Sequence, residues 1–161
     1  MTTDPLPSWN DGPTKDALLD FLAAAEEVPV PDRVAVFDND GTLWCEKPNY
    51  VQLEFMLAEL ARAAASDDSL RSRDEYRALL ENDTALQAEL GLERIALALV
   101  ELCAGIGPSE FDERVRAFFA TAVHRDRKLS YLSLRYAPML DLVEALRALD
   151  FDVFVVSGGG T

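Results

Sequence analysis

Two aspartates separated by one residue, Asp38 and Asp40, follow an apolar run over residues 34–37 and precede Gly41. Such β-branched and aromatic runs are typical of buried strands, so both carboxylates are expected where a strand ends. Crowded carboxylates repel each other unless a cation or hydrogen-bond donors offset their charge. A hard cation that prefers oxygen ligands, such as Mg²⁺, meets this need best. The spacing therefore predicts a metal-assisted site at Asp38 and Asp40.

Two ordinary structures share part of this pattern. Asp40-Gly41 after an apolar run is also a strong signal of a β-hairpin turn. A hairpin needs a second alternating strand at once, whereas the following residues run into a proline and then a helical pattern. An EF-hand calcium loop would place Asp38 and Asp40 at its third and fifth positions. Its first and last ligands would then be Val36 and Lys47, which cannot serve as ligands there, so the sequence favours neither alternative.

A second apolar run over residues 151–156 is followed by a hydroxyl and three glycines, Ser157 to Gly160. This pattern predicts a strand that opens onto a loop of exposed backbone N–H groups. Glycine lets the backbone approach phosphate oxygens closely, and converging N–H groups bind them as a nest. The alternative is a glycine-rich tail without a binding role. A Walker A loop is excluded because no Gly-Lys-Ser/Thr sequence follows, whereas a dinucleotide-binding fingerprint stays open.

The sequences VFDNDGT at 36–42 and VVSGGG at 155–160 resemble the first and second motifs of the haloacid dehalogenase superfamily, specifically its phosphatase branch. In that family the first aspartate attacks phosphorus, the second is the general acid and base, and the hydroxyl binds the phosphoryl group. The resemblance assigns these roles to Asp38, Asp40 and Ser157. An acid at Asp40 is similar to the phosphatases, because the dehalogenases of the superfamily lack it. Thr42 and Gly158 complete the predicted phosphate-binding residues.

The resemblance implies hydrolysis of a small phosphorylated metabolite through an aspartyl-phosphate on Asp38, as in phosphoserine phosphatase-like enzymes. Mg²⁺ is the implied cofactor, with Asp38 and Asp40 as its ligands, Asp40 through its backbone carbonyl. The family's lysine and further aspartates would lie beyond Thr161, so the chain is expected to be an N-terminal portion of a longer protein. The alternative is a truncated, non-catalytic fragment that binds phosphate or metal.

The expected fold class is α/β, with a Rossmann-like parallel-sheet core, incomplete at two visible strands, and an inserted helical cap. The core is predicted over residues 1–43 and 137–161, and the cap over 44–136. The segment between the motifs far exceeds the roughly dozen residues that a crossover between parallel strands requires. Both motifs are then expected at the carboxyl edge of the sheet, with some apolar sheet surface exposed.

Helical periodicity is clear in several places. Apolar residues recur at helical spacing over 14–27, 53–64 and 111–122, and a further helix is expected to start at Pro138. Residues 93–104 are apolar nearly all round, which predicts a buried helix, and Ser109 with Asp112 predicts a capping box. These segments offer no competing strand pattern, so the insertion is expected to be a small helical bundle.

Four residues outside the motifs could contact substrate or move protons. Glu46, Lys47 and Tyr50, just past the first motif, are expected as contacts with the substrate on the cap side, with solvated loop residues as the alternative. His124 is the single histidine and is expected to be a surface or cap residue rather than a catalytic base, because nothing in the sequence positions it near the motifs.

The composition restricts the partners. The 161 residues carry a formal net charge of −14, which disfavours nucleic acids and anionic membranes and leaves a small phosphorylated substrate as the expected partner. Cys45 and Cys103 lack the spacing of a zinc site or a disulfide framework. The sequence shows no secretory signal and no apolar run of about 18 residues, so a cytoplasmic location is expected and no membrane span is predicted. The oligomeric state is left open.

Overall fold

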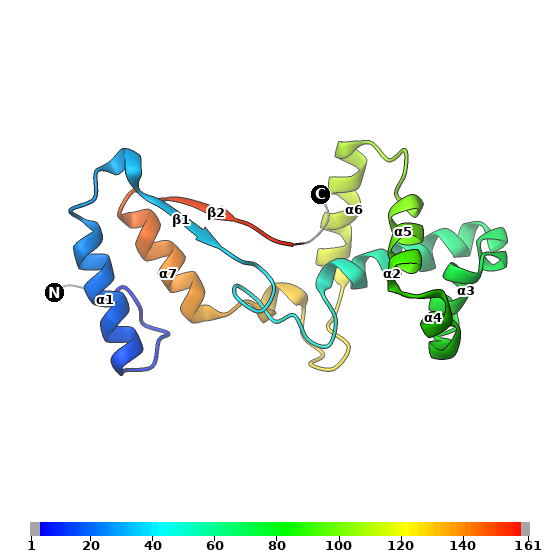
Figure 1. Cartoon of the computed structure of the whole chain (residues 1–161), viewed down its shortest axis with the longest axis horizontal. Coiled ribbons are helices and arrows are strands. Elements are labelled where there is room, and N and C mark those ends of the chain that lie inside the picture. Colours follow the sequence, from blue (N-terminus) through cyan, green and yellow to red (C-terminus); the bar gives the residue numbers. More distant parts are fainter. Residues whose placement is uncertain (1–3, 159–161) are drawn as a thin grey trace. The chain divides into compact units, whose positions relative to one another are not determined.

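The computed structural model describes residues 4–158 (Figure 1). Contacts divide the chain into two compact units. One consists of Met1–Pro48 together with Leu132–Thr161, and the other of Asn49–Tyr131. The first unit contains both motifs, and the second is inserted between them in the sequence.

The first unit is a mixed α/β structure. Its elements, in chain order, are α1 (Pro13–Ala25), the 3₁₀ helix η1 (Val30–Asp32), β1 (Val34–Phe37), α7 (Ala137–Ala148) and β2 (Asp152–Val155). The strands pair in parallel, with Val34 opposite Asp152 and Phe37 opposite Val155. A proline lies in the first turn of both helices, where the missing N–H has no intrahelical partner, so the sequence favours these starting points.

One face of the two strands packs against helices. Both α1 and α7 lie on the same side of the strands (Figure 1). The strand residues turned toward them are Ala35, Phe37 and Val153, and the buried residues of this core are Leu6, Leu22, Leu142 and Leu146. Leu6 comes from the segment before α1 and is completely buried, so this N-terminal segment is part of the core.

The other face of the strands is open. Side chains alternate between the two faces of a strand, and the residues between those in the core are exposed. Val34, Val36 and Phe154 are 53%, 59% and 54% exposed. The composition of the apolar run at 34–37 suggested a strand buried on both faces, but one face is exposed. The expectation that some apolar sheet surface is exposed is met.

The second unit is built from helices. Its elements are α2 (Val51–Ser66), the 3₁₀ helix η2 (Asp68–Ser72), α3 (Asp74–Leu80), α4 (Thr84–Leu90), α5 (Leu92–Leu102) and α6 (Pro108–Thr121). A further 3₁₀ helix, η3 (Tyr131–Leu134), spans the sequence boundary with the first unit. The buried core residues are Leu60, Tyr76, Ile95, Ala98 and Leu99. The Tyr76 hydroxyl donates to the carbonyl of Ala98 at 2.8 Å, so the polar atom in this core is satisfied.

Two expectations for the insertion are wrong in detail. The helix α5 is not buried all round, because Leu97 and Val100 are 59% and 62% exposed while Ile95 and Leu99 are buried. It is amphipathic, with its apolar residues continuing onto the outer face. The capping box at Ser109 does not form either, because Gly107 is the N-cap of α6 and no side chain caps this end.

The predicted fold class is confirmed: a small parallel α/β core is interrupted by a helical insertion. Among residues 4–158, no helix has both the length and the apolar composition that crossing a bilayer would demand.

Candidate active site

The first motif forms a tight turn at the end of β1. The carbonyl of Asn39 accepts from the backbone N–H groups of Thr42 at 3.2 Å and Leu43 at 2.8 Å. Gly41 has a φ of 78°, in the left-handed region that favours glycine. Its N–H donates to the carbonyl of Trp44 at 2.9 Å, so the chain turns back immediately after Asp40. This turn is neither a β-hairpin nor a calcium loop.

Asp38 and Asp40 differ in their surroundings within this turn. Asp38 is exposed where β1 ends, whereas Asp40 is half-buried. The indole Nε1–H of Trp44 donates to Oδ1 of Asp40 at 3.0 Å. A hydrogen bond from a neutral donor to a carboxylate restricts the side chain without neutralising its charge. Asp38 is therefore open to a ligand, and Asp40 is oriented by its neighbour.

The pairing of the strands brings the two motifs to one edge of the sheet. Phe37 is opposite Val155, and the N–H of Val156 donates to the carbonyl of Phe37 at 2.8 Å. Asp38 therefore directly follows β1, and Ser157 follows the adjacent parallel strand β2 after one intervening residue, Val156. Ser157 and Gly158 are exposed. The rest of the predicted glycine loop, Gly159 to Thr161, lies outside the described residues.

The other predicted contacts lie in different environments. Thr42 is half-buried within the motif turn. The Glu46 carboxylate lies against this turn, because a Cβ added to Gly41 would be 3.2 Å from its Oε2. Lys47 is exposed, with Nζ 3.9 Å from Oε1 of Glu46. Tyr50 belongs to the helical unit, directly before α2, and is 59% exposed.

Backbone bonds attach the first motif to the segment that leads into α7. The N–H of Cys45 donates to the carbonyl of Leu134 at 3.1 Å, and the N–H of Tyr136 donates to the carbonyl of Leu43 at 2.8 Å. Trp44 and Arg135 form an antiparallel bridge between these bonds. Trp44 was not selected from the sequence as a site residue. Its only signal there is an aromatic ring four residues after Asp40.

The donor set at this edge suits a cation that is shared with a ligand. Asp38 offers a carboxylate oxygen and Asp40 its backbone carbonyl oxygen, both of the hard type that Mg²⁺ prefers. Within residues 4–158, no three acidic, histidine or cysteine side chains are grouped so that they could hold a metal among themselves. Mg²⁺ usually keeps several waters and binds through one or two carboxylates plus phosphate oxygens, which is compatible with these two residues. Zinc and calcium sites need more protein ligands than the described residues bring together.

A parallel α/β core that presents carboxylates at the carboxyl ends of its strands belongs to the class of open-sheet α/β proteins, whose sites lie at this edge. The family model of haloacid dehalogenase-like hydrolases matches residues 35–161, from β1 through the second motif. The chain belongs to this family, as its motifs suggested, and its class of reaction is hydrolysis. The comparison with curated proteins returned no match.

Proposed function

We propose that the protein is a phosphatase that hydrolyses phosphomonoesters of small metabolites with Mg²⁺ as its cofactor. The observation that supports this proposal is the parallel register, in which β1 ends directly before Asp38 and the adjacent β2 ends two residues before Ser157. Hydrolases of this family that have an acidic residue at the position of Asp40 can protonate the oxygen of the leaving alcohol. A dehalogenase does not need this proton. The acid therefore favours phosphate esters as substrates.

In the first half-reaction Asp38 is the nucleophile. One of its carboxylate oxygens attacks phosphorus, and the bond between phosphorus and the ester oxygen breaks. Asp40 gives a proton to that departing oxygen, so the alcohol leaves as a neutral molecule. The hydroxyl groups of Ser157 and Thr42, with the backbone N–H group of Gly158, bind the phosphoryl oxygens.

In the second half-reaction Asp40, now a carboxylate, takes a proton from water. The water oxygen attacks phosphorus, the bond to Asp38 breaks, and inorganic phosphate leaves with both aspartates restored. Bound at Asp38 and Asp40, Mg²⁺ would supply positive charge that offsets the repulsion between carboxylate and phosphate.

The helical unit is proposed to act as a cap that selects the substrate. Asn49–Tyr131 folds around a core of its own, as an element that opens and closes must. With a net charge of −14, the chain has no general field that attracts anions, so a local cation must offset the charge of the substrate. The same charge disfavours nucleic acids and anionic membranes as partners.

Hydrolysis of 4-nitrophenyl phosphate, with and without Mg²⁺, tests the proposal. We expect turnover that requires Mg²⁺ and falls by roughly 10³-fold or more in Asp38→Asn, because the amide cannot form the covalent intermediate. The matched control is Asp20→Asn, an identical change at an exposed position on α1. Binding of Mg²⁺ or inorganic phosphate without any turnover would contradict the proposal and support a non-catalytic binding protein.

A further inference from the structure

The hydrogen bond between Trp44 and Asp40 has a defined direction. An indole nitrogen donates a hydrogen bond and cannot accept one. Nε1 of Trp44 is 3.0 Å from Oδ1 of Asp40, so Oδ1 must be the acceptor in this contact. In a protonated carboxyl group the hydroxyl oxygen is a weaker acceptor than the carbonyl oxygen, so the bond from Trp44 favours the carbonyl form at Oδ1. A proton on the Asp40 carboxyl group is therefore directed to the second oxygen, Oδ2.

The backbone of Trp44 is held on two sides. The backbone carbonyl of Trp44 accepts from the N–H of Gly41 at 2.9 Å, and this bond closes the motif turn. The same residue bridges to Arg135, and the backbone bonds of the neighbouring residues flank that bridge. Rotation about the terminal torsion of an aspartate is broad and nearly two-fold, so a free carboxylate exchanges its oxygens readily. An indole that extends from this anchored backbone and donates to one oxygen favours a single orientation of the Asp40 carboxyl group.

We propose that Trp44 is a positioning residue for general acid catalysis, which holds the transferable proton of Asp40 on Oδ2. This inference rests on the proposed phosphatase function. When the ester P–O bond breaks and the bond from Asp38 to phosphorus forms, the proton passes from Oδ2 to the departing oxygen. In the second half-reaction, Oδ2 accepts the proton of the attacking water. Trp44 keeps its own N–H throughout, so it acts through Asp40 alone.

The leaving group distinguishes this role from a merely structural one. An alkoxide is a poor leaving group and needs the proton, whereas 4-nitrophenolate leaves as a stable anion near neutral pH. A defect in positioning the proton must therefore slow phosphoryl transfer from an alkyl phosphate more than from 4-nitrophenyl phosphate. General damage to the site slows both reactions alike.

The experiment compares Trp44→Phe with Trp9→Phe. Trp9 is the other tryptophan, is likewise half-buried in the first unit, and its indole donates to the carbonyl of Pro138 at 2.7 Å. In single-turnover experiments with Mg²⁺, we expect Trp44→Phe to slow transfer from propyl phosphate by about 10-fold or more and from 4-nitrophenyl phosphate by less than about 3-fold. Trp9→Phe is expected to leave the rate of transfer from both substrates unchanged.

Two further variants protect the test against misfolding. In the Trp9→Phe background, β-(3-benzothienyl)alanine at position 44 keeps the bicyclic ring but has sulfur in place of the N–H group, and is expected to show the same selective loss. Asp40→Ala in that background is expected to move the indole ¹⁵N–H resonance and speed its exchange with water. An unmoved resonance would show that the contact does not form.

The experiments distinguish a failure of the positioning role of Trp44 from a failure of the proposed phosphatase function. If the Trp44 variants slow both substrates equally, or slow neither, the positioning role is overturned while the phosphatase function stands. If the wild-type protein shows no Mg²⁺-dependent turnover, or keeps its activity in Asp38→Asn, the proposed function fails and the inference falls with it.

Discussion

In the proposed mechanism a single residue, Asp40, makes two proton transfers. It lies in a turn closed by backbone bonds, and its carboxylate accepts from the indole of Trp44. Orientation of a proton donor matters because transfer requires hydrogen-bond contact with the reacting oxygen. The turn supplies this orientation before any substrate binds.

Replacing Asp40 by Asn tests the acid–base role directly. The amide keeps an oxygen that can accept from Trp44, so the turn should persist, but it cannot give or take the catalytic proton. We expect kcat for propyl phosphate to fall by about 10²–10⁴-fold, the range that acid–base catalysis typically supplies. Steady-state kinetics measures the loss, and a thermal melting curve close to that of the wild type confirms folding. A reduction of less than about fivefold would assign the proton transfer to another group.

Gly41 is the second residue on which the turn depends. An alanine would have to adopt a φ of 78°, and its Cβ would lie 3.2 Å from Oε2 of Glu46. We expect Gly41→Ala to destabilise the protein by about 1–2 kcal/mol through the left-handed backbone, and to reduce activity as the turn shifts. Urea unfolding and turnover measure the two effects.

Gly91 is the matched control for this change. Its φ of 79° is nearly the same, but a Cβ there would meet nothing within 4 Å. Its ψ of 153° lies near a region that essentially only glycine adopts, so Gly91→Ala should cost at least as much stability as Gly41→Ala and leave turnover intact. Equal losses of activity in both variants would argue that backbone strain anywhere disturbs the protein, and would remove the special role of the motif turn.

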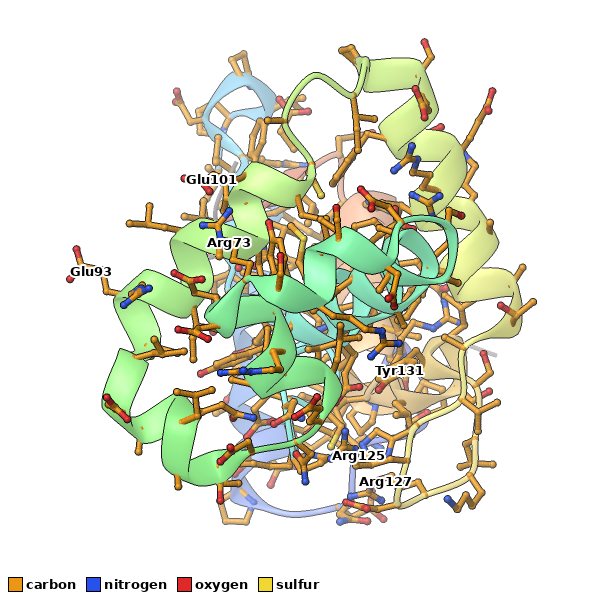
Figure 2. All side chains as sticks on the ribbon, turned by 90° about the vertical axis from the view of Figure 1, so that its right-hand side faces the viewer. Arg73, Glu93, Glu101, Arg125, Arg127 and Tyr131 are labelled. Atoms are coloured by element: carbon orange, nitrogen blue, oxygen red, sulfur yellow. The ribbon has the colours of Figure 1, made fainter. Side chains whose placement is uncertain are left out.

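At the scale of elements, a buried acid connects two helices of the insertion. Glu75 on α3 is only 5% exposed and accepts from Nε of Arg94 on α5 at 2.6 Å. Arg73 also donates to Glu75, and its guanidinium contacts Glu101 at 2.7 Å (Figure 2). The same guanidinium lies over the Tyr76 ring. A bond from its own backbone N–H, and then the bond from Arg94, lower the pKa of Glu75 from 4.5 to about 2.

This lowered pKa predicts how stability depends on pH. Because the folded state favours the ionised form, Glu75 contributes its full stabilisation above its unfolded pKa of 4.5. The contribution is lost as the pH falls from there toward 2. We expect Glu75→Gln to lower the free energy of unfolding at pH 7 by about 1.5–3 kcal/mol, typical of bonds to a charged group. It should also flatten the fall in stability between pH 4.5 and 2.

Urea unfolding at pH 7 and at acidic pH measures both effects. Glu93→Gln is the control, because Glu93 lies on α5, is exposed, and points outward in Figure 2. That variant should keep the acid-dependent loss of the wild type. An unchanged slope in Glu75→Gln would mean that this ion pair does not form in solution.

At the scale of the whole molecule, the open face of the sheet is the most conspicuous feature. Exposed apolar patches bind hydrophobic dyes and partners, whereas single exposed apolar residues do not. We expect the double variant Val36→Thr and Phe154→Thr to reduce the fluorescence of bound anilinonaphthalene sulfonate clearly. Stability should change little, because both residues are more than half exposed and threonine also suits strands.

The control for this prediction is Val100→Thr on α5. Val100 is 62% exposed but lies on a helix of the other unit. Its replacement should leave the fluorescence nearly unchanged. If the sheet variant and the helix variant reduce the signal equally, the dye is not reporting on the strands.

Some features followed from local patterns because their physical cause is local. The strands at β1 and β2, the start of α7 at its proline and the turn after Asp40 depend on residues adjacent in sequence. Helical spacing likewise predicted α1, α2 and α6, whereas the short helices α3 and α4 gave too little periodicity to be expected. The roles assigned to Asp38, Asp40 and Ser157 stay predictions.

Tertiary structure decided what depends on partners far along the chain. His124 was expected at the surface or in the cap. It lies in the inserted helical unit but is 2% exposed, and its Nδ1 accepts from the backbone N–H groups of Asp126 and Arg127. Contacts with distant parts of the chain also decide three other features. These are the exposed outer face of α5, the open face of the sheet and the bridge from Trp44 to Arg135. The amino-acid sequence was enough to predict the family and the parallel core with its insertion, because motifs and periodicity depend on neighbouring residues. The packing of distant segments decides which side chains are buried and which donor orients Asp40. Local sequence patterns do not predict this packing.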